Sequence, residues 1–429
     1  MDLADRDSHA AGRAVRTVGV LGAGTMGSGI AISLATAGLD VALVDTNPEA
    51  LAAGMDRVRS TLRAAVEKGR LDADAAAAAA ARIRTSDGID ALEPADLVIE
   101  AVFESLAVKR EVFASLGKIC RAGAVLASNT STLDIDAIAA ASGRASDVVG
   151  MHFFSPANIM RLVEIVRGRE TSPDVIATAR AVTGRMGKLG VVVGNCFGFV
   201  GNRMLYAYGR ENQLLLLEGA APAQVDAALE KFGMAMGPNA VGDLAGIDVG
   251  YRVRRERKDL PDDPRYYRVA DLLFEAGRLG QKTGRGAYLY PGGSRKPVRD
   301  PEVESMIAAE SARLGIERRA IPDDEIVHRC LFALINEGAL ILEQEIAASP
   351  GDIDAIWCNG YGFPRSRGGP MSHADTLGTA AVLEGIRGFE RTLGPRYWTP
   401  APLLRELAAS GGTFHSWQLR REAAEDGGA

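Results

Sequence analysis

The chain has 429 residues, of which 47% are hydrophobic and 24% charged, so it is long enough for more than one hydrophobic core and has a globular composition. A net charge of -6 gives no overall attraction to nucleic acid or to an anionic membrane, and we expect neither as a partner. No apolar stretch approaches a membrane span, residues 1–15 lack the apolar core of a signal peptide, and the ending Gly427-Gly428-Ala429 is not a peroxisomal signal.

A glycine-rich turn follows the first apolar run. After residues 1–15, which we expect to form a flexible arm, residues 18–21 predict a strand and residues 25–34 a helix. Between them, Gly22 permits a tight bend, Gly24 lets a pyrophosphate approach the backbone, and Gly27 lets the helix pack near the strand. We predict that this turn binds a dinucleotide through Gly22, Ala23, Gly24, Thr25, Met26 and Gly27.

An acidic residue ends the next apolar run. Residues 41–44 predict a second strand, and Asp45 follows it about 20 residues beyond the glycines, where a carboxylate can accept the ribose hydroxyls. The same charge would repel the 2′-phosphate of NADP, so NAD is the predicted cofactor. The alternative is a glycine turn that is present for steric reasons, with Asp45 facing solvent.

Apolar runs then alternate with helical segments. This alternation predicts a parallel, doubly wound sheet whose ligand lies at the carboxyl ends of the strands. Residues 47–81 interrupt it as a long, mostly helical excursion with an alanine-rich helix at residues 75–81. The remaining predicted strands are at residues 82–84, 97–102, 124–128, 148–154, 162–166 and 191–193.

Helices dominate after Cys196. A long apolar helix is predicted at residues 202–217, a loop at 291–297, and a solvated helix face at the basic run 252–258. A second helical block begins near Pro322 and resembles the first: Val225-Asp226-Ala227-Ala228-Leu229 matches Ile353-Asp354-Ala355-Ile356-Trp357, Gly237-Pro238 matches Gly369-Pro370, and Asp243-Leu244-Ala245-Gly246 matches Asp375-Thr376-Leu377-Gly378. We interpret this as a duplicated helical domain whose copies pack face to face within one chain, as in a symmetric dimer.

The four cysteines indicate neither a zinc site nor a disulfide framework. They lie far apart, without a C-x-x-C pair or a neighbouring histidine, at Cys120, Cys196, Cys330 and Cys358. We therefore predict no bound metal and expect a reducing compartment, the cytoplasm.

A histidine and a glutamate lie on neighbouring predicted strands. His152 stands at the end of one strand and Glu164 lies twelve residues further on, in the next. A carboxylate on one imidazole nitrogen fixes the tautomer and raises the basicity of the other, which is what removal of a proton from an alcohol requires. The alternative is a structural pair that braces the sheet.

Two further polar residues face the same edge. Ser131 follows a strand and could hydrogen-bond a reacting oxygen, although Ser131-x-x-Asp134 also fits a helix capping box, which spacing alone favours. Asn202 opens the long helix, where its amide could polarise a carbonyl or serve as a cap. The residues alone decide neither case.

Several long motifs in one order resemble the L-3-hydroxyacyl-CoA dehydrogenase family. The resemblance covers residues 16–417 and is most marked to the dehydrogenase part of multifunctional β-oxidation enzymes, without their enoyl-CoA hydratase region. It rests on Gly22 to Gly27, Glu100-Ala101-Val102-Phe103-Glu104, Ser128-Asn129-Thr130-Ser131, Met151-His152-Phe153-Phe154-Ser155-Pro156-Ala157, Gly198-Phe199-Val200-Gly201-Asn202-Arg203, Gly280-Gln281-Lys282-Thr283-Gly284-Arg285-Gly286 and Asn359-Gly360-Tyr361-Gly362-Phe363-Pro364-Arg365.

The resemblance implies roles for individual residues. His152 would be the general base and Glu164 its orienting partner, while Ser131 and Asn202 would bind the oxygens of the substrate. Because the second copy has His328-Arg329 where the first has Asn202-Arg203, it looks structural, with one active site per chain. The glycine turn, Asp45, Glu104, Lys109, Ser131 and Ser155 would contact NAD, and Thr61, Lys68 and Lys109 would join Ser131 and Asn202 at the acyl-CoA substrate.

The resemblance also implies a fold and a reaction. We expect a Rossmann-type domain at residues 16–195, a first helical domain at 196–290, a linker at 291–320, a second helical copy at 321–410 and a tail at 411–429. The reaction would be the reversible, NAD-dependent oxidation of an L-3-hydroxyacyl-CoA to a 3-ketoacyl-CoA in fatty acid β-oxidation or related metabolism. The alternatives are a dehydrogenase of a small free hydroxy acid and a catalytically silent NAD-binding structural protein. The chain could be a monomer or a homodimer, and a separately encoded enoyl-CoA hydratase could dock to it.

Overall fold

The computed structural model describes residues 10–426 and divides into two compact units. The first unit holds the chain up to Asn202, Ile341–Tyr361 and the residues from Glu422 onward; the second holds Arg203–Leu340 and Gly362–Arg421. Residues 1–9 of the predicted arm and 427–429 of the predicted tail lie outside the described residues.

An eight-stranded sheet forms the centre of the first unit, in the order β3-β2-β1-β4-β5-β6-β7-β8. Neighbouring strands are parallel except for β6 and β7, which are antiparallel. The doubly wound sheet predicted from the sequence is therefore confirmed, except that β7 and β8 run opposite to the other six strands. The strands are β1 (Thr17–Leu21), β2 (Asp40–Val44), β3 (Ile83–Ser86), β4 (Leu97–Glu100), β5 (Val125–Ser128), β6 (Val148–Phe153), β7 (Leu162–Arg167) and β8 (Leu189–Gly194).

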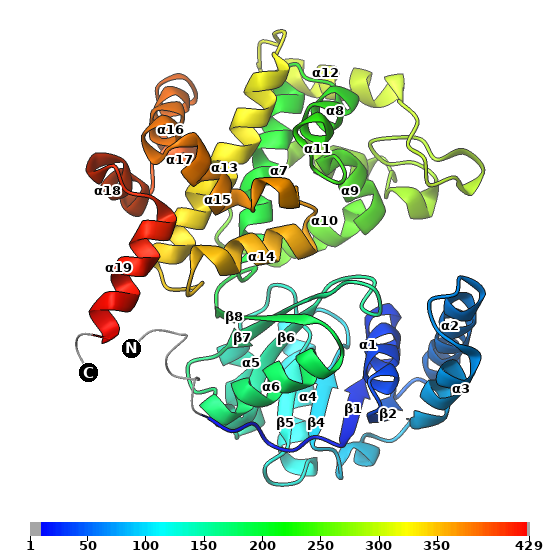
Figure 1. The fold of residues 1–429 in the computed structure, drawn as a ribbon. Coiled ribbons are helices and arrows are strands. Elements are labelled where there is room, and N and C mark those ends of the chain that lie inside the picture. The colour runs from blue at the N-terminus through cyan, green and yellow to red at the C-terminus, as the bar shows by residue number, and fades with distance from the viewer. Residues whose placement is uncertain (1–9, 427–429) are drawn as a thin grey trace. The chain divides into compact units, whose positions relative to one another are not determined.

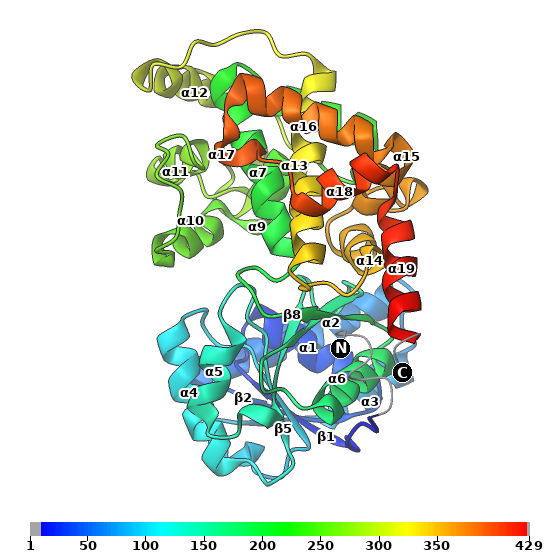
Figure 2. The same ribbon diagram turned by 90° about the vertical axis from the view of Figure 1, so that its left-hand side faces the viewer.

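Helices cover both faces of this sheet (Figures 1 and 2). Successive strand residues point to opposite faces, so Val125 and Ala127 pack into one hydrophobic cluster while Ala124 and Leu126 pack into the other. A parallel sheet covered on both faces explains the almost continuous apolar runs in the sequence. The covering helices are α1 (Thr25–Thr36), α2 (Pro48–Glu67), α3 (Ala73–Arg82), α4 (Leu106–Ile119), α5 (Ile135–Ser142) and α6 (Pro173–Arg185).

The long helical excursion predicted between the second and third strands consists of α2 and α3. The Asn47 side chain accepts hydrogen bonds from the N–H groups of Glu49 and Ala50 and so starts α2. Asp72 caps α3 in the same way. Val58 and Leu62 on α2 are buried in the core, which fixes the excursion against the sheet domain.

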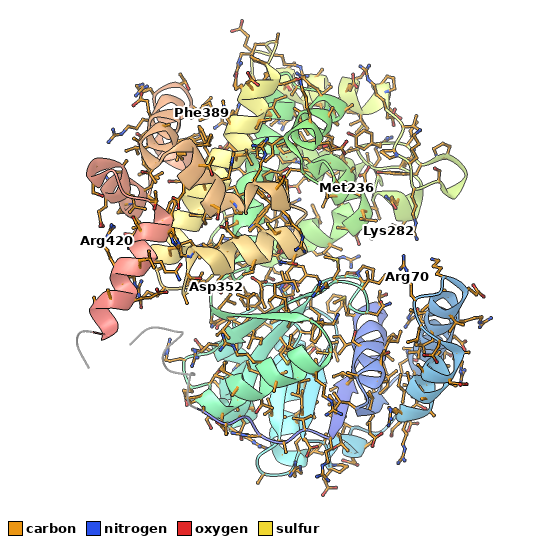
Figure 3. All side chains as sticks on the ribbon, in the orientation of Figure 1. Arg70, Met236, Lys282, Asp352, Phe389 and Arg420 are labelled. Atoms are coloured by element: carbon orange, nitrogen blue, oxygen red, sulfur yellow. The ribbon has the colours of Figure 1, made fainter. Side chains whose placement is uncertain are left out.

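Residues from the predicted second helical copy complete the first unit. The N–H of Gly194 donates to the carbonyl of Ile346, and Val193 forms a bridge with Ala347, so the edge of the sheet at β8 is covered. Helix α14 (Pro350–Gly360) then packs on β7 and β8. A capping box between Ser349 and Asp352 starts α14, and Figure 3 labels Asp352 there.

Two long helices lie side by side in the second unit, α7 (Gly201–Glu218) and α13 (Asp323–Glu343) (Figures 1 and 2). Within residues 10–426, no helix is both long and apolar enough to cross a membrane. The other helices after the sheet are α8 (Pro222–Phe232), α9 (Pro238–Ala245), α10 (Ile247–Glu256), α11 (Arg268–Glu275), α12 (Pro301–Arg313), α15 (Pro370–Leu377), α16 (Thr379–Leu393), α17 (Pro395–Trp398), α18 (Pro402–Ser410) and α19 (Phe414–Asp426).

The predicted repeat has a counterpart in the hydrogen bonds of the second unit. Asp243, near the end of α9, accepts from the backbone N–H groups of Ala287 and Tyr288. Asp375, near the end of α15, accepts from those of Phe414 and His415. Both helices begin at the proline of the matched Gly-Pro pair, so matched residues hold matched structure.

Two details differ from the sequence prediction. The predicted linker contains α12, whose start is capped by Asp300. The basic run is not uniformly solvated, because the Arg254 side chain on α10 is only 6% exposed, forms an ion pair with Asp271 and lies over the ring of Tyr267. Periodicity could not show this, since an arginine can bury its guanidinium where a carboxylate and a ring receive it.

Candidate active site

The glycine turn has the geometry that a dinucleotide requires. Gly22 has a positive φ of 103°, and a Cβ on Gly27 would lie 1.8 Å from the carbonyl oxygen of Gly22, so both positions need glycine. A Cβ on Gly24 would meet no atom within 4 Å, so the space over this residue is open. Gly24 is also the N-cap of α1, where backbone N–H groups of the first turn are available to an anion. These residues fit a pyrophosphate.

Asp45 lies beside this turn, at the end of β2. One carboxylate oxygen accepts from the N–H of Ala23 at 2.8 Å and the other from the N–H of Asn47 at 3.0 Å. The carboxylate is thereby fixed next to the turn, the place predicted for the acceptor of the ribose hydroxyls.

A buried lysine contacts two acidic residues, one at the end of β4 and one just after it. Lys109 has no exposed side-chain surface, and its ammonium lies 2.6 Å from Glu100 Oε1 and 3.4 Å from Glu104 Oε2. Glu104 Oε1 accepts from Ser131 N, Ser131 Oγ and Thr130 Oγ1, at 2.8, 3.0 and 2.7 Å. The ammonium of Lys109 is therefore directed at two carboxylates, and its predicted direct contacts with NAD and substrate stay predictions.

Ser131 is not a helix cap. The N-cap of α5 is Asp134, whose carboxylate accepts from the N–H of Asp136 at 2.9 Å. The capping box that spacing favoured is therefore wrong, because Asp134 satisfies the helix start itself. The Ser131 hydroxyl instead donates to Glu104, and the two residues meet at the carboxyl ends of β5 and β4.

His152 and Glu164 face each other across the antiparallel pair β6 and β7. Nδ1 of His152 lies 2.7 Å from Oε2 of Glu164, and the two side chains are 7% and 0% exposed. The other oxygen of Glu164 accepts from the N–H groups of Val200 and Gly201, at 3.2 and 2.9 Å. In this arrangement Nδ1 carries the proton, so the lone pair of Nε2 is available to act as a base.

Aromatic rings surround the imidazole. The rings of Phe154 and Phe199 lie 4.4 and 5.9 Å from that of His152, centroid to centroid. Phe199 is fully buried and has a positive φ of 52°, following Gly198 at 71°. This backbone conformation is rare for a non-glycine residue and directly precedes the two N–H groups that bind Glu164.

Asn202 lies in the first turn of α7, next to Ser131. Its Nδ2 donates to the backbone carbonyl of Ser131 at 3.1 Å, and its Oδ1 accepts from the Tyr361 hydroxyl at 2.9 Å. Sequence reasoning missed Tyr361, which lies 159 residues further along the chain. The only signal was its place in the motif Asn359-Gly360-Tyr361-Gly362, which carries no functional assignment by itself.

Three other predicted residues are partly or fully exposed to solvent. Ser155 is exposed after β6, whereas Thr61 is half-buried on α2 and Lys68 is exposed at the end of that helix. Figure 3 labels Arg70 near the same end of α2. In the described part of the chain, no three His, Cys, Asp or Glu side chains form a candidate metal site.

Family models match most of the chain. Residues 17–196 match the 3-hydroxyacyl-CoA dehydrogenase NAD-binding domain, and residues 198–290 and 326–414 both match the C-terminal domain of the same family.

Curated relatives carry related names. A peroxisomal bifunctional enzyme of Danio rerio is 45% identical over 93% of this chain and 57% of its own length. The fatty acid oxidation complex subunit alpha of Psychrobacter arcticus is 36% identical over 94% of this chain and 56% of its own length. The chain thus spans little more than half the length of the relatives it matches.

Solved structures agree with these matches. A 3-hydroxybutyryl-CoA dehydrogenase from Escherichia coli superposes with a TM-score of 0.80 at 29% identity, covering 93% of this chain and 99% of that one. The dehydrogenase part of multifunctional enzyme 1 from C. elegans gives 0.68 at 31% identity, covering 94% and 92%. The sheet, the His–Glu pair and the doubled helical match together place this chain in the 3-hydroxyacyl-CoA dehydrogenase family.

Proposed function

We propose that the chain is an NAD-dependent dehydrogenase that reversibly converts an L-3-hydroxyacyl-CoA to a 3-ketoacyl-CoA, in fatty acid β-oxidation or related acyl-CoA metabolism. The observation that carries the proposal is the buried pair of His152 and Glu164, in which the carboxylate holds Nδ1 and leaves Nε2 as a base. Membership of the family supports the substrate class.

In the proposed reaction, Nε2 of His152 takes the proton of the 3-hydroxyl group. Glu164 stabilises the imidazolium that forms, and two backbone N–H groups hold its carboxylate in place. Ser131 and Asn202 hydrogen-bond the oxygens of the substrate. NAD, when bound, supplies the acceptor for the hydride that leaves C3.

The same proposal assigns the binding residues. The turn from Gly22 to Gly27 binds the pyrophosphate of NAD, and the open space over Gly24 supports this assignment. Asp45 binds a ribose, and its carboxylate, which is held by the N–H of Ala23, supports that assignment. Lys109 holds Glu104 in place. The further contacts with NAD are Glu104, Lys109, Ser131 and Ser155, and those with the acyl-CoA are Thr61, Lys68, Lys109, Ser131 and Asn202.

The proposed function is tested by measuring NADH oxidation with acetoacetyl-CoA and longer 3-ketoacyl-CoAs. Free acetoacetate is assayed in parallel as the substrate without coenzyme A. We expect turnover of the CoA thioesters and a loss of ~10²-fold or more in kcat for His152→Gln. His328→Gln on α13, exposed and outside the site, is the matched control and should retain activity. Turnover of the free acid alone would favour a dehydrogenase of a small free hydroxy acid. Binding of NADH without turnover of any substrate would favour a catalytically silent NAD-binding protein.

We also propose a domain organisation that follows the family: residues 16–195, 196–290 and 321–410, with 291–320 as the linker. The two separate matches to the C-terminal domain support it. Pairing of the two copies within the chain favours a monomer over a homodimer, and a separate enoyl-CoA hydratase is a candidate partner. Light scattering after gel filtration, alone and with a hydratase, distinguishes these states.

The proposed compartment is the cytoplasm. What supports it is the sequence pattern of four widely spaced cysteines without a C-x-x-C pair. Because one relative is named peroxisomal, fractionation of the source cells is the direct test.

A further inference from the structure

Tyr361 ends α14 and is held there from several sides. Its N–H donates to the carbonyl of Trp357 at 3.2 Å, and its ring stacks on that of Trp357 at 4.7 Å and 24°. On another side the ring meets Phe154 edge-on at 5.4 Å and 83°. Phe154 in turn packs on His152. The phenol is therefore fixed within the first unit, one ring away from the catalytic imidazole.

The ring also lies directly on the start of α7. A Cβ on Gly201 would lie 2.4 Å from Cε2 and 2.5 Å from the hydroxyl oxygen of Tyr361, so this approach requires glycine at position 201. The N–H of the same Gly201 donates to Glu164. One glycine thus brings the phenol, the carboxylate partner of His152 and the neighbouring Asn202 to the same place.

The Tyr361 hydroxyl determines how the Asn202 amide is oriented. Burial raises the pKa of Tyr361 well above its usual value, with a smaller contribution from the charge of Glu164, so the hydroxyl keeps its proton. It donates that proton to Oδ1 of Asn202. The amide nitrogen then points to the carbonyl of Ser131 with one N–H and keeps the second for another acceptor. Without the hydroxyl, the carbonyl of Ser131 would orient the amide with no donor to hold Oδ1 from the other side.

We propose that Tyr361 is a positioning residue for the dehydrogenase reaction: its hydroxyl fixes the Asn202 amide so that the second N–H is presented to the substrate oxygen that His152 deprotonates. This inference rests on the proposed function. It also gives the second helical copy a part in the chemistry, because residues 341–361 come from that copy and belong to the first unit.

Tyr361→Phe keeps the ring and removes only the hydroxyl, so it is the direct test. With acetoacetyl-CoA and NADH, we expect kcat to fall about tenfold, the scale of one hydrogen bond, while the KM for NADH stays unchanged. Tyr290→Phe is the matched control, because it removes a buried hydroxyl that donates to Asp243 in the second unit, and it should retain wild-type kcat. The melting temperature of each variant checks that it folds.

A double-mutant cycle separates positioning from a structural role. If the hydroxyl acts through Asn202, Tyr361→Phe should cost nothing further in an Asn202→Ala background, whereas independent effects would add. Full additivity, or a Tyr361→Phe enzyme as active as the wild type, would overturn the inference and leave the proposed function standing. A wild-type protein without activity on any 3-ketoacyl-CoA would overturn the proposed function, and the inference with it.

Discussion

Gly24 and Gly27 belong to one motif but differ in what surrounds them. The position of a Cβ on Gly24 is open space, whereas on Gly27 it collides with the backbone of the same turn. At the scale of single residues, Gly24 therefore leaves room for a ligand, whereas Gly27 is required by the fold.

This difference predicts the outcome of two alanine substitutions. Gly24→Ala should fold with an unchanged melting temperature and bind NADH at least about tenfold more weakly, because its methyl group occupies the space of the pyrophosphate. Gly27→Ala should lower the melting temperature, since the backbone must move. Calorimetric titration with NADH and thermal unfolding measure the two effects, and equal NADH affinity for Gly24→Ala and wild type would contradict the assignment.

The sequence predicts a contact between two residues where both lie on neighbouring strands of the sheet. His152 and Glu164 lie on strands joined by a short connection, and the predicted contact forms. Spacing misled at Ser131, because a serine that fits a capping pattern can donate elsewhere. Tyr361 could not be found, since its contact with Asn202 depends on how distant segments pack.

His373, on α15, is a buried histidine whose charge is disfavoured. Its ring packs edge-on against Phe232 at 5.2 Å and lies tilted against Phe363 at 6.3 Å. Burial lowers its pKa below the usual 6.5, and the nearby charges of Arg367 and His328 lower it further. Between the lowered pKa and 6.5 the unfolded chain binds more protons than the folded one, so stability falls as the pH falls through this range.

We therefore expect the melting temperature to drop between about pH 7.5 and about pH 5.5, and to drop less in His373→Gln, which cannot take up the proton. Scanning calorimetry at the two pH values measures this. His415→Gln, at an exposed histidine on α19, should keep the wild-type drop. If His373→Gln loses as much as the wild type, another group is responsible.

At the scale of elements, one arginine joins the two long helices. Arg329 on α13 has no exposed side-chain surface and pairs with Glu211 and Glu218 on α7. Glu211 is fully buried as well and also pairs with Arg210, so loss of the Arg329 guanidinium would weaken the compensation of a buried carboxylate.

Arg329→Met should lower the free energy of unfolding by up to about 3–5 kcal/mol, the upper end being limited because Glu211 keeps Arg210 as a partner. Urea unfolding followed by circular dichroism measures it. The control is Arg391→Ala on α16, because the pair of Arg391 and Glu384 is about two-thirds exposed and should contribute under about 1 kcal/mol. A similar loss of unfolding free energy in the two variants would mean that the buried ion pair contributes no more than the exposed one.

Elements with strong local signals were predicted and the others were not. The excursion of α2 and α3 follows from caps and alanine content, which are local properties. Helix α12 was assigned to a linker, because the loop before it contains glycine and proline. Burial of Arg254 depends on Asp271 and Tyr267, which approach it only in the folded chain.

At the scale of the whole molecule, the repeat and the packing divide the chain differently. Matched residues identified the two helical copies in the sequence, and both match one family domain. The compact units nevertheless place residues 341–361 with the sheet, because Ile346 and Ala347 cover β8 and α14 packs on β7 and β8. No pattern along the chain shows which core a helix joins.

This division predicts what happens when the second copy is removed. A chain that stops at residue 320 lacks the segment that pairs with β8 and also lacks Arg329, so it exposes a sheet edge and loses the buried guanidinium that pairs with Glu211 on α7. We expect it to aggregate, and we expect coexpressed residues 321–429 to restore soluble protein and activity, since the contacts that are lost are not covalent. Gel filtration and NADH oxidation measure recovery. A truncated chain that is monodisperse and active alone would show that the sheet domain needs neither the β8 cover nor Tyr361.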